Sequence, residues 1–293
     1  MNLYQIIAIV ISAIILGSIY ALIAVGLSLC WGTIRIFNFA QGALLMLSAY
    51  LTWYFAVSLN MLQFSYLVVI IIICSVMFGI GLVLEKVLVE PIIGRSNIVV
   101  LAILTTLSAS IFLQNSVLLI FGPRSKQLPK TIEGVAKFGG QVIGYHELLI
   151  VVLTLFILLG FRFFLKKTKV GMALRSVEQN REAALLMGIN VSWVYSLAFG
   201  ISTLMAALGG IMIGSIYTLT PTIGEAPLLK AFIIVVLGGL GSFEGTILAC
   251  YVVAIIEAFS TYFVGLFWSP IILFALMILI LILRPSGLLG EAE

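Results

Sequence analysis

The sequence predicts an all-α integral membrane protein, a polytopic bundle of about eight transmembrane helices with one further short or re-entrant helix. Of its 293 residues, 63% are hydrophobic and only 9% are charged, whereas soluble domains average about 45–50% apolar and about 25% charged residues. The mean hydropathy is +1.29, and the apolar residues gather in runs of about 20, the length that crosses a bilayer as a helix. No long polar linker divides the chain, so residues 1–293 are expected to form a single transmembrane domain.

The apolar runs define the expected spans in order. No basic segment precedes the first run, so we expect a retained span rather than a cleaved signal peptide. The run 229–240 is too short for an ordinary span and ends in the glycine-rich break LGGLGS. Such breaks are tolerated at membrane depth where they are buried or line a cavity. The expected spans are 6–30, 38–58, 64–84, 98–120, 147–165, 193–216, the short run 229–240, 246–264 and 269–283.

Basic residues set the expected orientation. The loop 162–191 carries six basic and two acidic residues, and the loop 122–147 carries four basic and two acidic ones. One span separates the two loops, and the more basic loop is expected in the cytoplasm. This places a loop at 166–192 inside and the N-terminus outside a bacterial cytoplasmic (inner) membrane.

The loop 121–147 on the other side predicts a short β-hairpin, because Gly139 and Gly140 separate two β-prone pieces. It would either dock an external partner or form a solvated cap.

The composition excludes most catalytic chemistry. The chain has no Asp and one His, so paired-Asp magnesium sites, His-rich metal sites and a Ser-His-Asp triad are ruled out. His146 is interpreted as an interfacial residue, and Cys30, Cys74 and Cys250 as buried free thiols, because their spacing fits no disulfide or metal pattern. We therefore expect no catalytic residue, metal or cofactor, and the net charge of +4 does not indicate nucleic-acid binding.

Small residues recur at helical spacing in two spans. Ala13, Gly17 and Ala21 form one stripe, and a second stripe recurs every four residues in a later span. Such stripes allow close helix–helix packing in membranes. The second stripe consists of Ser202, Ala206, Gly210 and Gly214.

The segment 171–190, GMALRSVEQNREAALLMGIN, concentrates charge in an apolar chain. Leu174 and Val177 share one helix face, and Asn180 is a good N-cap for a second short helix at 181–187 that Gly188 would end. Two short amphipathic helices at the membrane surface would be either an interfacial anchor or an element that fits a groove in a partner protein. The small aliphatic surface favours the groove.

The same segment carries a family resemblance. Glu182, Ala183 and Ala184 followed by Gly188 resemble the EAA-x3-G coupling motif of ABC importer permeases, where a cytoplasmic helix inserts into the ATPase subunit. Three further stretches are similar, in the same order, to the branched-chain amino acid ABC transporter permease family, and the first is closer to its shorter, LivH-type subunit than to the LivM-type partner. They are GSIYALIAVGLSLCWGTIRIFNFAQGALLMLSAY (17–50), LLKAFIIVVLGGLGSFEGTILA (228–249) and LRPSGLLG (283–290).

The resemblance implies a permease without its own ATP site, and the sequence agrees because it lacks the phosphate-cradling pattern GxxxxGK[ST]. The implied partners are a related second permease, two cytoplasmic ABC ATPases, an external or periplasmic solute-binding protein and membrane lipid. The residues expected to couple to the ATPase are Gly171, Arg175, Glu178, Gln179, Asn180, Arg181, Glu182, Ala183, Ala184 and Gly188.

A pathway for branched-chain amino acids should be mostly apolar with a few polar groups. Glu257 is a candidate because ionisable residues inside membranes often have a functional role. A structural hydrogen-bonding role fits Glu257 equally well. Lys230 is expected to snorkel. The other candidate pathway residues are Asn38, Gln41 and the backbone at Gly238, Gly239 and Gly241, which is expected to be exposed to the pathway.

Other substrates and mechanisms stay open at this point. A permease for urea, amides or other amino acids would share the same pattern. A secondary transporter or channel would need ion-coupling residues within spans, for which Glu257 is the only clear candidate. An integral-membrane enzyme is remote because Asp is absent.

Overall fold

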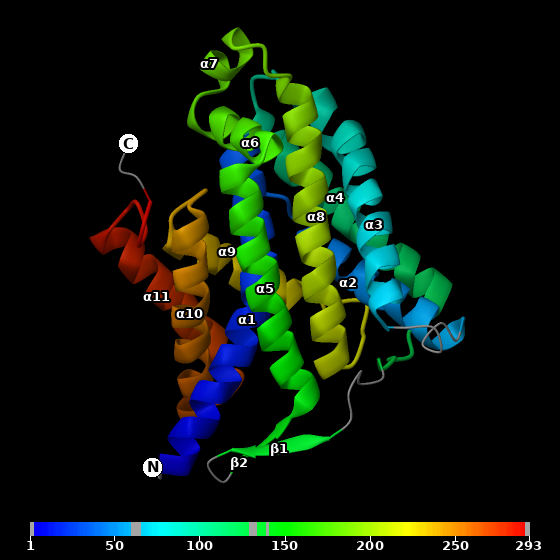
Figure 1. Cartoon of the computed structure of the whole chain (residues 1–293), viewed down its shortest axis with the longest axis vertical. Coiled ribbons are helices and arrows are strands. Elements are labelled where there is room, and N and C mark those ends of the chain that lie inside the picture. The colour runs from blue at the N-terminus through cyan, green and yellow to red at the C-terminus, as the bar shows by residue number, and fades with distance from the viewer. Residues whose placement is uncertain (1–2, 60–65, 129–133, 139–140, 291–293) are drawn as a thin grey trace.

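The computed structural model describes residues 3–59, 66–128, 134–138 and 141–290. It is a bundle of long helices with one small hairpin (Figure 1). The helices are α1 (Leu3–Ile34), α2 (Gln41–Trp53), α3 (Tyr66–Leu84), α4 (Ile98–Phe121), α5 (Tyr145–Lys167), α6 (Lys169–Gln179), α7 (Arg181–Leu186), α8 (Val191–Ile216), α9 (Glu225–Gly238), α10 (Phe243–Val264) and α11 (Ser269–Leu283). A π-helical turn, Tyr54–Ser58, extends α2, and Glu85–Val89 and Glu90–Ile92 extend α3.

Six of the described helices are long and apolar enough to cross a membrane, and Gln41–Val57 and Ser269–Leu283 are shorter apolar helices. The predicted class, a polytopic helical membrane protein, is therefore confirmed. Every predicted span contains a helix, and the boundaries differ by a few residues. The short run 229–240 belongs to α9, which begins earlier, at Glu225. The membrane-length helices are Leu3–Ile34, Tyr66–Ile92, Ile98–Phe121, Tyr145–Lys167, Val191–Ile216 and Phe243–Val264.

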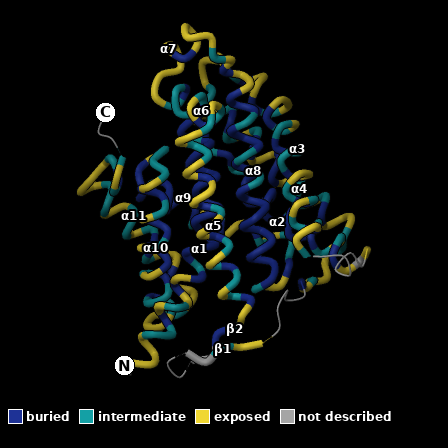
Figure 2. The backbone as a smooth tube through the Cα atoms, in the orientation of Figure 1, coloured by how far each residue is buried: buried dark blue, intermediate teal, exposed yellow. Residues whose placement is uncertain are grey.

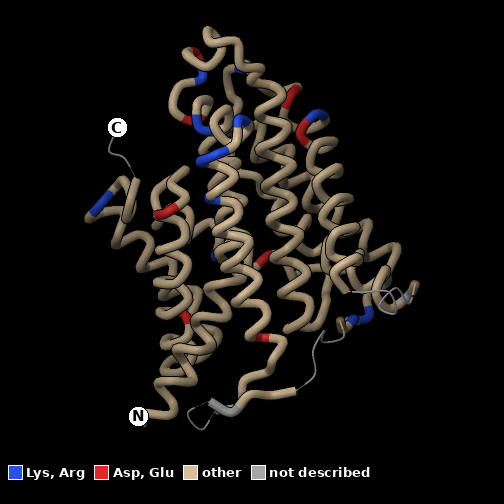
Figure 3. The backbone as a smooth tube through the Cα atoms, viewed as in Figure 1, with Lys and Arg blue, Asp and Glu red and all other residues tan. Residues whose placement is uncertain are grey.

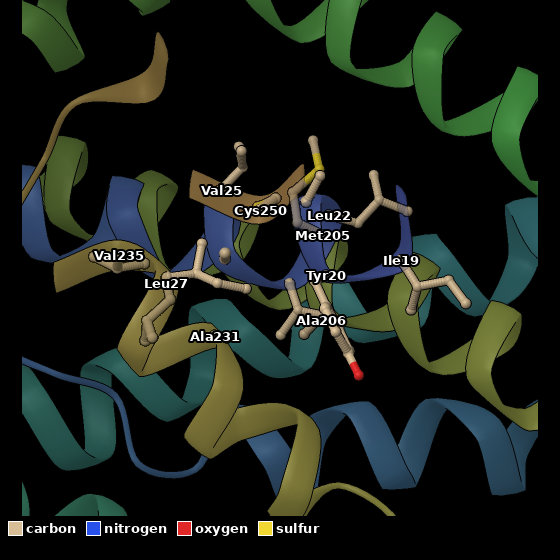
Figure 4. Packing of buried hydrophobic residues seen from close by; sticks show 14 of the residues in the cluster. Ile19, Tyr20, Leu22, Val25, Leu27, Met205, Ala206, Ala231, Val235 and Cys250 are labelled. Carbon is tan, nitrogen blue, oxygen red and sulfur yellow. The ribbon is translucent and has the colours of Figure 1, made fainter. Parts of the chain in front are cut away.

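The centre of the bundle is formed by α1 and α8. The apolar window of α8 is 83% buried, whereas that of α4 is only 11% buried, and Figure 2 shows the same contrast between inner and outer helices. Figure 4 shows side chains of α1, α8, α9 and α10 meeting in one cluster that includes Tyr20, Met205 and Val235. The helices with little buried surface lie on the outside, where lipid would cover them.

The small-residue stripe of α8 faces α2. Gly210 lies against the Leu45 carbonyl and the Ser48 hydroxyl, where a Cβ atom would have no room. The Ser48 hydroxyl also donates a hydrogen bond to the Ala207 carbonyl at 3.2 Å. In α1, the Gly17 position is also closely packed, because an added Cβ would lie 2.8 Å from the Tyr251 ring of α10. Small residues thus allow close approach of the central helices.

The two short helices α2 and α9 begin beside each other. A Cβ atom on Gly42 would lie 2.6 Å from the Gly224 carbonyl oxygen, so the two N-terminal ends touch through bare backbone. The segment before α2 is not helical, and Ile36, Asn38 and Ala40 in it are fully or almost fully buried. The chain therefore enters the bundle interior before α2 starts.

The bundle has two distinct ends. We call the end that holds α6, α7 and the C-terminus the α6–α7 end, and the opposite end, which holds the N-terminus, β1 and β2, the hairpin end (Figure 1). Strand β1 (Val135–Phe138) pairs antiparallel with β2 (Gln141–Gly144). The predicted Gly139–Gly140 turn lies outside the described residues.

His146 follows the hairpin at the start of α5. It is 3% exposed, and its Nε2 shares a 2.7 Å hydrogen bond with the Ser215 hydroxyl of α8. The α5–α8 contact therefore buries His146 between two helices, and its predicted interfacial depth in the membrane stays a prediction.

Candidate functional site

The charged segment folds back onto the end of α5. The Thr168 hydroxyl caps α6 by accepting a hydrogen bond from the Gly171 amide at 3.0 Å. Gly171 packs on α5 so closely that a Cβ atom would overlap the Phe164 carbonyl. Arg175 Nε donates to the Leu165 carbonyl at 3.0 Å. These contacts fix the direction of α6 and bury Leu174 and Val177, as the sequence predicts.

Glu178 of α6 reaches the ends of two other elements. Its carboxylate lies against the backbone of Gly32, in the last turn of α1, where an added Cβ would overlap an oxygen of Glu178. On its other side is Gly241, in the loop after α9, where a Cβ would lie 2.9 Å from Oε1. We call the space between these glycines the glycine notch. It brings together a predicted coupling residue, Glu178, and a predicted pathway residue, Gly241.

The environment of Glu178 shifts its titration toward neutral pH. Burial raises the pKa of the Glu178 carboxyl to about 7, while the positive charges of Arg35 and Arg175 act in the opposite direction. Arg35 is the only non-glycine residue with positive φ in the described part of the chain, at 62°. It sits where the chain turns inward after α1.

A cavity of about 430 Å³ opens beside the notch. Its walls come from the ends of α1 and α5, from α6, from the loop after α9 and from the C-terminal tail. Glu244 is paired on the cavity wall with Lys166 at 3.0 Å and with Arg162 at 3.3 Å. The charged residues that line the cavity are Arg35, Arg162, Lys166, Arg175, Glu178 and Glu244.

The second short helix, α7, has the two ends that the sequence predicts. Asn180 Oδ1 accepts a hydrogen bond from the Ala183 amide at 3.0 Å, which confirms the N-cap. Gly188 has φ +80°, its amide donates to Leu185, and the Ile189 amide donates to Ala184, both at 3.0 Å. This pairing is the Schellman arrangement that ends a helix with a left-handed residue.

Helix α7 carries an apolar tip that was not predicted from the sequence. Leu185, Leu186 and Met187 are 51%, 89% and 82% exposed, next to the exposed Arg181 and Glu182. A helix of six residues can bury only one side, and here Ala184 occupies it. The run Leu185–Met187 before a glycine was the available signal.

The glycine break after α9 is not open. The Leu288 and Leu289 amides of the C-terminal tail donate to the Leu237 and Gly238 carbonyls at 2.8 and 3.1 Å. Gly239, with φ +100°, packs directly on Gly290. The expectation of exposed backbone at Gly238 and Gly239 was therefore wrong, because the stretches 228–249 and 283–290 cover each other. Gly241 faces the cavity instead.

Asn38 and Gln41 lie at the buried start of α2. Asn38 Oδ1 accepts from the Ala40 amide at 3.0 Å, and Gln41 Nε2 donates to the Ser202 carbonyl at 3.1 Å. The Ser202 hydroxyl donates back to Gln41 Oε1 at 3.2 Å. Both side chains are 0% exposed and are absent from the cavity lining. Gln41 ties α2 to α8, whereas Asn38, among the described residues, bonds only within the segment at the start of α2.

Glu257 of α10 forms a buried ion pair. Lys230 of α9 donates to Glu257 Oε1 at 2.5 Å and to the Tyr20 hydroxyl at 2.9 Å, and Tyr20 donates to Glu257 at 3.3 Å. The Lys230 side chain is only 19% exposed. Lys230 was expected to snorkel, but α9 starts deep in the bundle, so its second turn holds the amine within reach of Glu257. The predicted pathway residues thus lie at three separate places.

The long apolar helices define a multi-pass membrane protein. The chain belongs to the branched-chain amino acid ABC transporter permease family: the family profile described as "branched-chain amino acid transport system / permease component" matches residues 9–281. Proteins of this family are permease subunits of ABC importers of the inner membrane and not enzymes.

Curated relatives match over almost the full length. The chain is 31% identical to the high-affinity branched-chain amino acid transport permease BraD of Pseudomonas aeruginosa, covering 100% of this chain and 98% of the relative. It is 32% identical to LivH of Escherichia coli, over 96% and 94% of the two chains. A probable branched-chain amino acid permease of Methanocaldococcus jannaschii is 26% identical, over 95% and 90%. No solved structure matches the chain.

Proposed function

We propose that this subunit carries branched-chain amino acids, or closely related hydrophobic amino acids, into the cell. The observation that carries the proposal is the full-length identity of 31–32% to permeases whose names specify branched-chain amino acids. Urea, amides and other amino acids are the competing substrates.

The chain works with separate ATPases. Its sequence has no GxxxxGK[ST] loop, so hydrolysis belongs to partner subunits. A related second permease completes the translocation unit, two cytoplasmic ATPases drive it, and an external solute-binding protein delivers the substrate. Such an arrangement needs one docking surface on each side of the membrane.

The docking element for the ATPase is α7 with the end of α6. The apolar tip Leu185–Met187 would enter a groove, and the flanking charges of Arg181 and Glu182 would fix its orientation. An exposed apolar patch rimmed by polar residues is typical of a protein–protein contact. The interfacial-anchor reading is weaker, because α7 projects from the tip of the bundle (Figure 1).

The glycine notch would pass movement of α6 into the bundle. Glu178 touches the end of α1 and the loop between α9 and α10, and α1 packs against α8, α9 and α10. Closure of the ATPases on α7 would therefore reach the central helices through Glu178, in addition to the packing of α6 on α5 and α8. To shift a conformational equilibrium of the transporter from 1:99 to 99:1, a ligand must bind one conformation about 5.5 kcal/mol more tightly than the other, and a nucleotide cycle can provide this difference.

The α6–α7 end faces the cytoplasm in this proposal. Figure 3 shows basic residues gathered at that end and few over the middle of the bundle. Excess Lys and Arg mark cytoplasmic segments. The basic residues at the ends and turns of this side are Arg35, Lys86, Arg95, Arg162, Lys166, Lys167, Lys169, Arg175, Arg181 and Arg284. The hairpin end then faces outward, where the binding protein docks.

Reconstitution tests the proposal. The subunit, its second permease and the ATPases are placed in proteoliposomes, and binding protein is added outside with radiolabelled leucine, isoleucine, valine, phenylalanine or urea. We expect ATP-dependent uptake of the branched-chain amino acids, and no uptake when the ATPases lack their catalytic residues. Uptake without ATPases would indicate a secondary transporter, and uptake of urea alone would reassign the substrate.

A further inference from the structure

The cavity at the α6–α7 end contains charges of both signs that form no direct ion pair with one another, although Arg35 and Arg175 act electrostatically on Glu178. Among the described residues, no hydrogen bond and no ion pair within 4 Å engages the Arg35 guanidinium or the Glu178 carboxylate. Arg175 uses only its Nε, in the bond to Leu165. Glu244, by contrast, is neutralised by Lys166 and Arg162. On the α1–α6 side of the cavity, the Arg35, Arg175 and Glu178 side chains therefore lie near one another without direct hydrogen bonds between them.

The remaining walls are apolar. Val25, Leu29, Phe161, Leu240 and Leu289 line the same space. Its volume, about 430 Å³, falls within the roughly 300–1,000 Å³ of small-molecule sites, which combine apolar walls with a few convergent polar groups.

This combination matches one class of ligand. A planar guanidinium pairs with a carboxylate through two parallel hydrogen bonds, and a carboxylate pairs with an ammonium. A zwitterionic α-amino acid presents both groups on one carbon, and an aliphatic side chain would occupy the apolar walls. A purely anionic ligand would be repelled by the Glu178 carboxylate, and a purely cationic ligand would be repelled by Arg35 and Arg175.

We propose that this cavity is a binding site for a free aliphatic α-amino acid entering from the α6–α7 end. Its carboxylate binds Arg35 and Arg175, and its ammonium binds Glu178. The inference rests on the proposed function, which makes this end cytoplasmic and makes leucine, isoleucine and valine the transported solutes. Because Glu178 is also the side chain in the glycine notch, a bound amino acid holds α6 in place and slows transport. The site therefore makes the transporter sensitive to its own accumulated product.

Direct binding is the first test. The whole transporter, in nanodiscs and without binding protein, is titrated with tritiated leucine in a scintillation proximity assay. Leucinamide lacks the carboxylate and isocaproate lacks the ammonium, so both should compete at least about tenfold more weakly than leucine. Arg35→Asn removes the guanidinium but keeps a residue that tolerates positive φ, and it should weaken leucine binding by at least about tenfold. Lys167→Gln removes a charge at the same end outside the cavity and should bind as the wild type does.

Transport gives the second test. Proteoliposomes with the α6–α7 end inside are preloaded with leucine or left empty, and initial uptake rates are compared as a ratio for each variant. Preloading should lower the rate severalfold in wild type and in Lys167→Gln, and much less in Arg35→Asn. Equal leucine binding by wild type and Arg35→Asn would overturn the inference. Equal uptake rates in empty and in leucine-preloaded wild-type vesicles would also overturn the inference, and the proposed function would then stand. Absence of branched-chain amino acid uptake by empty wild-type vesicles would refute the proposed function itself, and this inference with it.

Discussion

The carboxylate of Glu178 lies against the bare backbone of Gly241, although one residue belongs to the charged segment and the other to the glycine break after α9. A Cβ on Gly241 would approach Oε1 to 2.9 Å. Two motifs that are separate in the sequence are thus one contact in the structure, and this contact joins the short surface helices to the transmembrane helices.

Gly32→Ala tests that contact. Gly32 is helical, so alanine brings no backbone strain there, but its Cβ would overlap the Glu178 carboxylate. The overlapping atoms are the far end of the flexible Glu178 side chain, so Glu178 should leave the notch at little cost in stability. Substrate-stimulated ATP hydrolysis by the complex should fall by about tenfold, the equivalent of about 1.4 kcal/mol, while membrane levels stay normal.

Gly160→Ala is the matched control for this substitution, because nothing lies within 4 Å of the added methyl group on α5. If Gly32→Ala and Gly160→Ala hydrolyse ATP at the same stimulated rate, the notch does not transmit movement.

Gly188→Val tests the end of α7. Gly188 has φ +80°, and nothing lies within 4 Å of an added Cβ. Valine should therefore disturb the turn through backbone strain and not through a steric clash. A non-glycine residue held in such a region costs about 1–3 kcal/mol, so the turn should open and ATPase subunits should no longer co-purify. Gly188→Asn should retain them, because asparagine tolerates the left-handed region. Normal co-purification with valine would revive the interfacial-anchor reading of α7.

Glu257→Gln tests the buried pair. Removing one partner leaves the Lys230 charge uncompensated, and breaking such pairs costs about 3–5 kcal/mol. We expect a lower melting temperature in detergent and reduced accumulation in the membrane. The double variant Lys230→Met with Glu257→Gln should recover most of the loss, since it leaves no buried charge. A double variant as unstable as the single one would argue that Glu257 acts through something other than Lys230.

The pH dependence of stability tests the environment of Glu178. Its pKa is raised from 4.5 to about 7 by burial, with Arg35 and Arg175 opposing. Between these values the folded protein binds more protons than the unfolded chain, so this residue should lower stability as pH rises from about 4.5 to about 7, with no further change above. Melting temperatures of the complex measured from pH 5 to 8 should show this decline. In Glu178→Gln, the part of the decline that Glu178 causes should be absent. An identical pH profile in the variant would rule out a raised pKa at Glu178.

Cysteine labelling tests the orientation. Arg124→Cys at the hairpin end and Lys167→Cys at the α6–α7 end replace exposed residues. In sealed cells an impermeant maleimide should label position 124 and not position 167, and permeabilisation should make both reactive. External labelling of position 167 would invert the topology.

Local chemistry made some of these features predictable. The helix cap at Asn180 and the left-handed conformation of Gly188 depend only on neighbouring residues, so both could be predicted from the sequence. The pairing of Lys230 with Glu257 and Tyr20 depends on how deeply α9 starts, which no residue of α9 signals. The cover over Gly238 likewise comes from the tail, through backbone bonds that leave no trace in side-chain patterns. Sequence thus located the helices and their ends, whereas the contacts between distant elements required the folded chain.

The contact between the C-terminal tail and the glycine break has a practical consequence. It is made by main-chain hydrogen bonds and by glycines packed on glycines, so it recognises backbone shape more than side-chain identity. Shortening the chain before Leu288 would strip the cover from α9 and open one wall of the cavity. Affinity tags and fluorescent reporters are therefore better attached at the N-terminus, at the far end of the bundle, than fused directly behind residue 290.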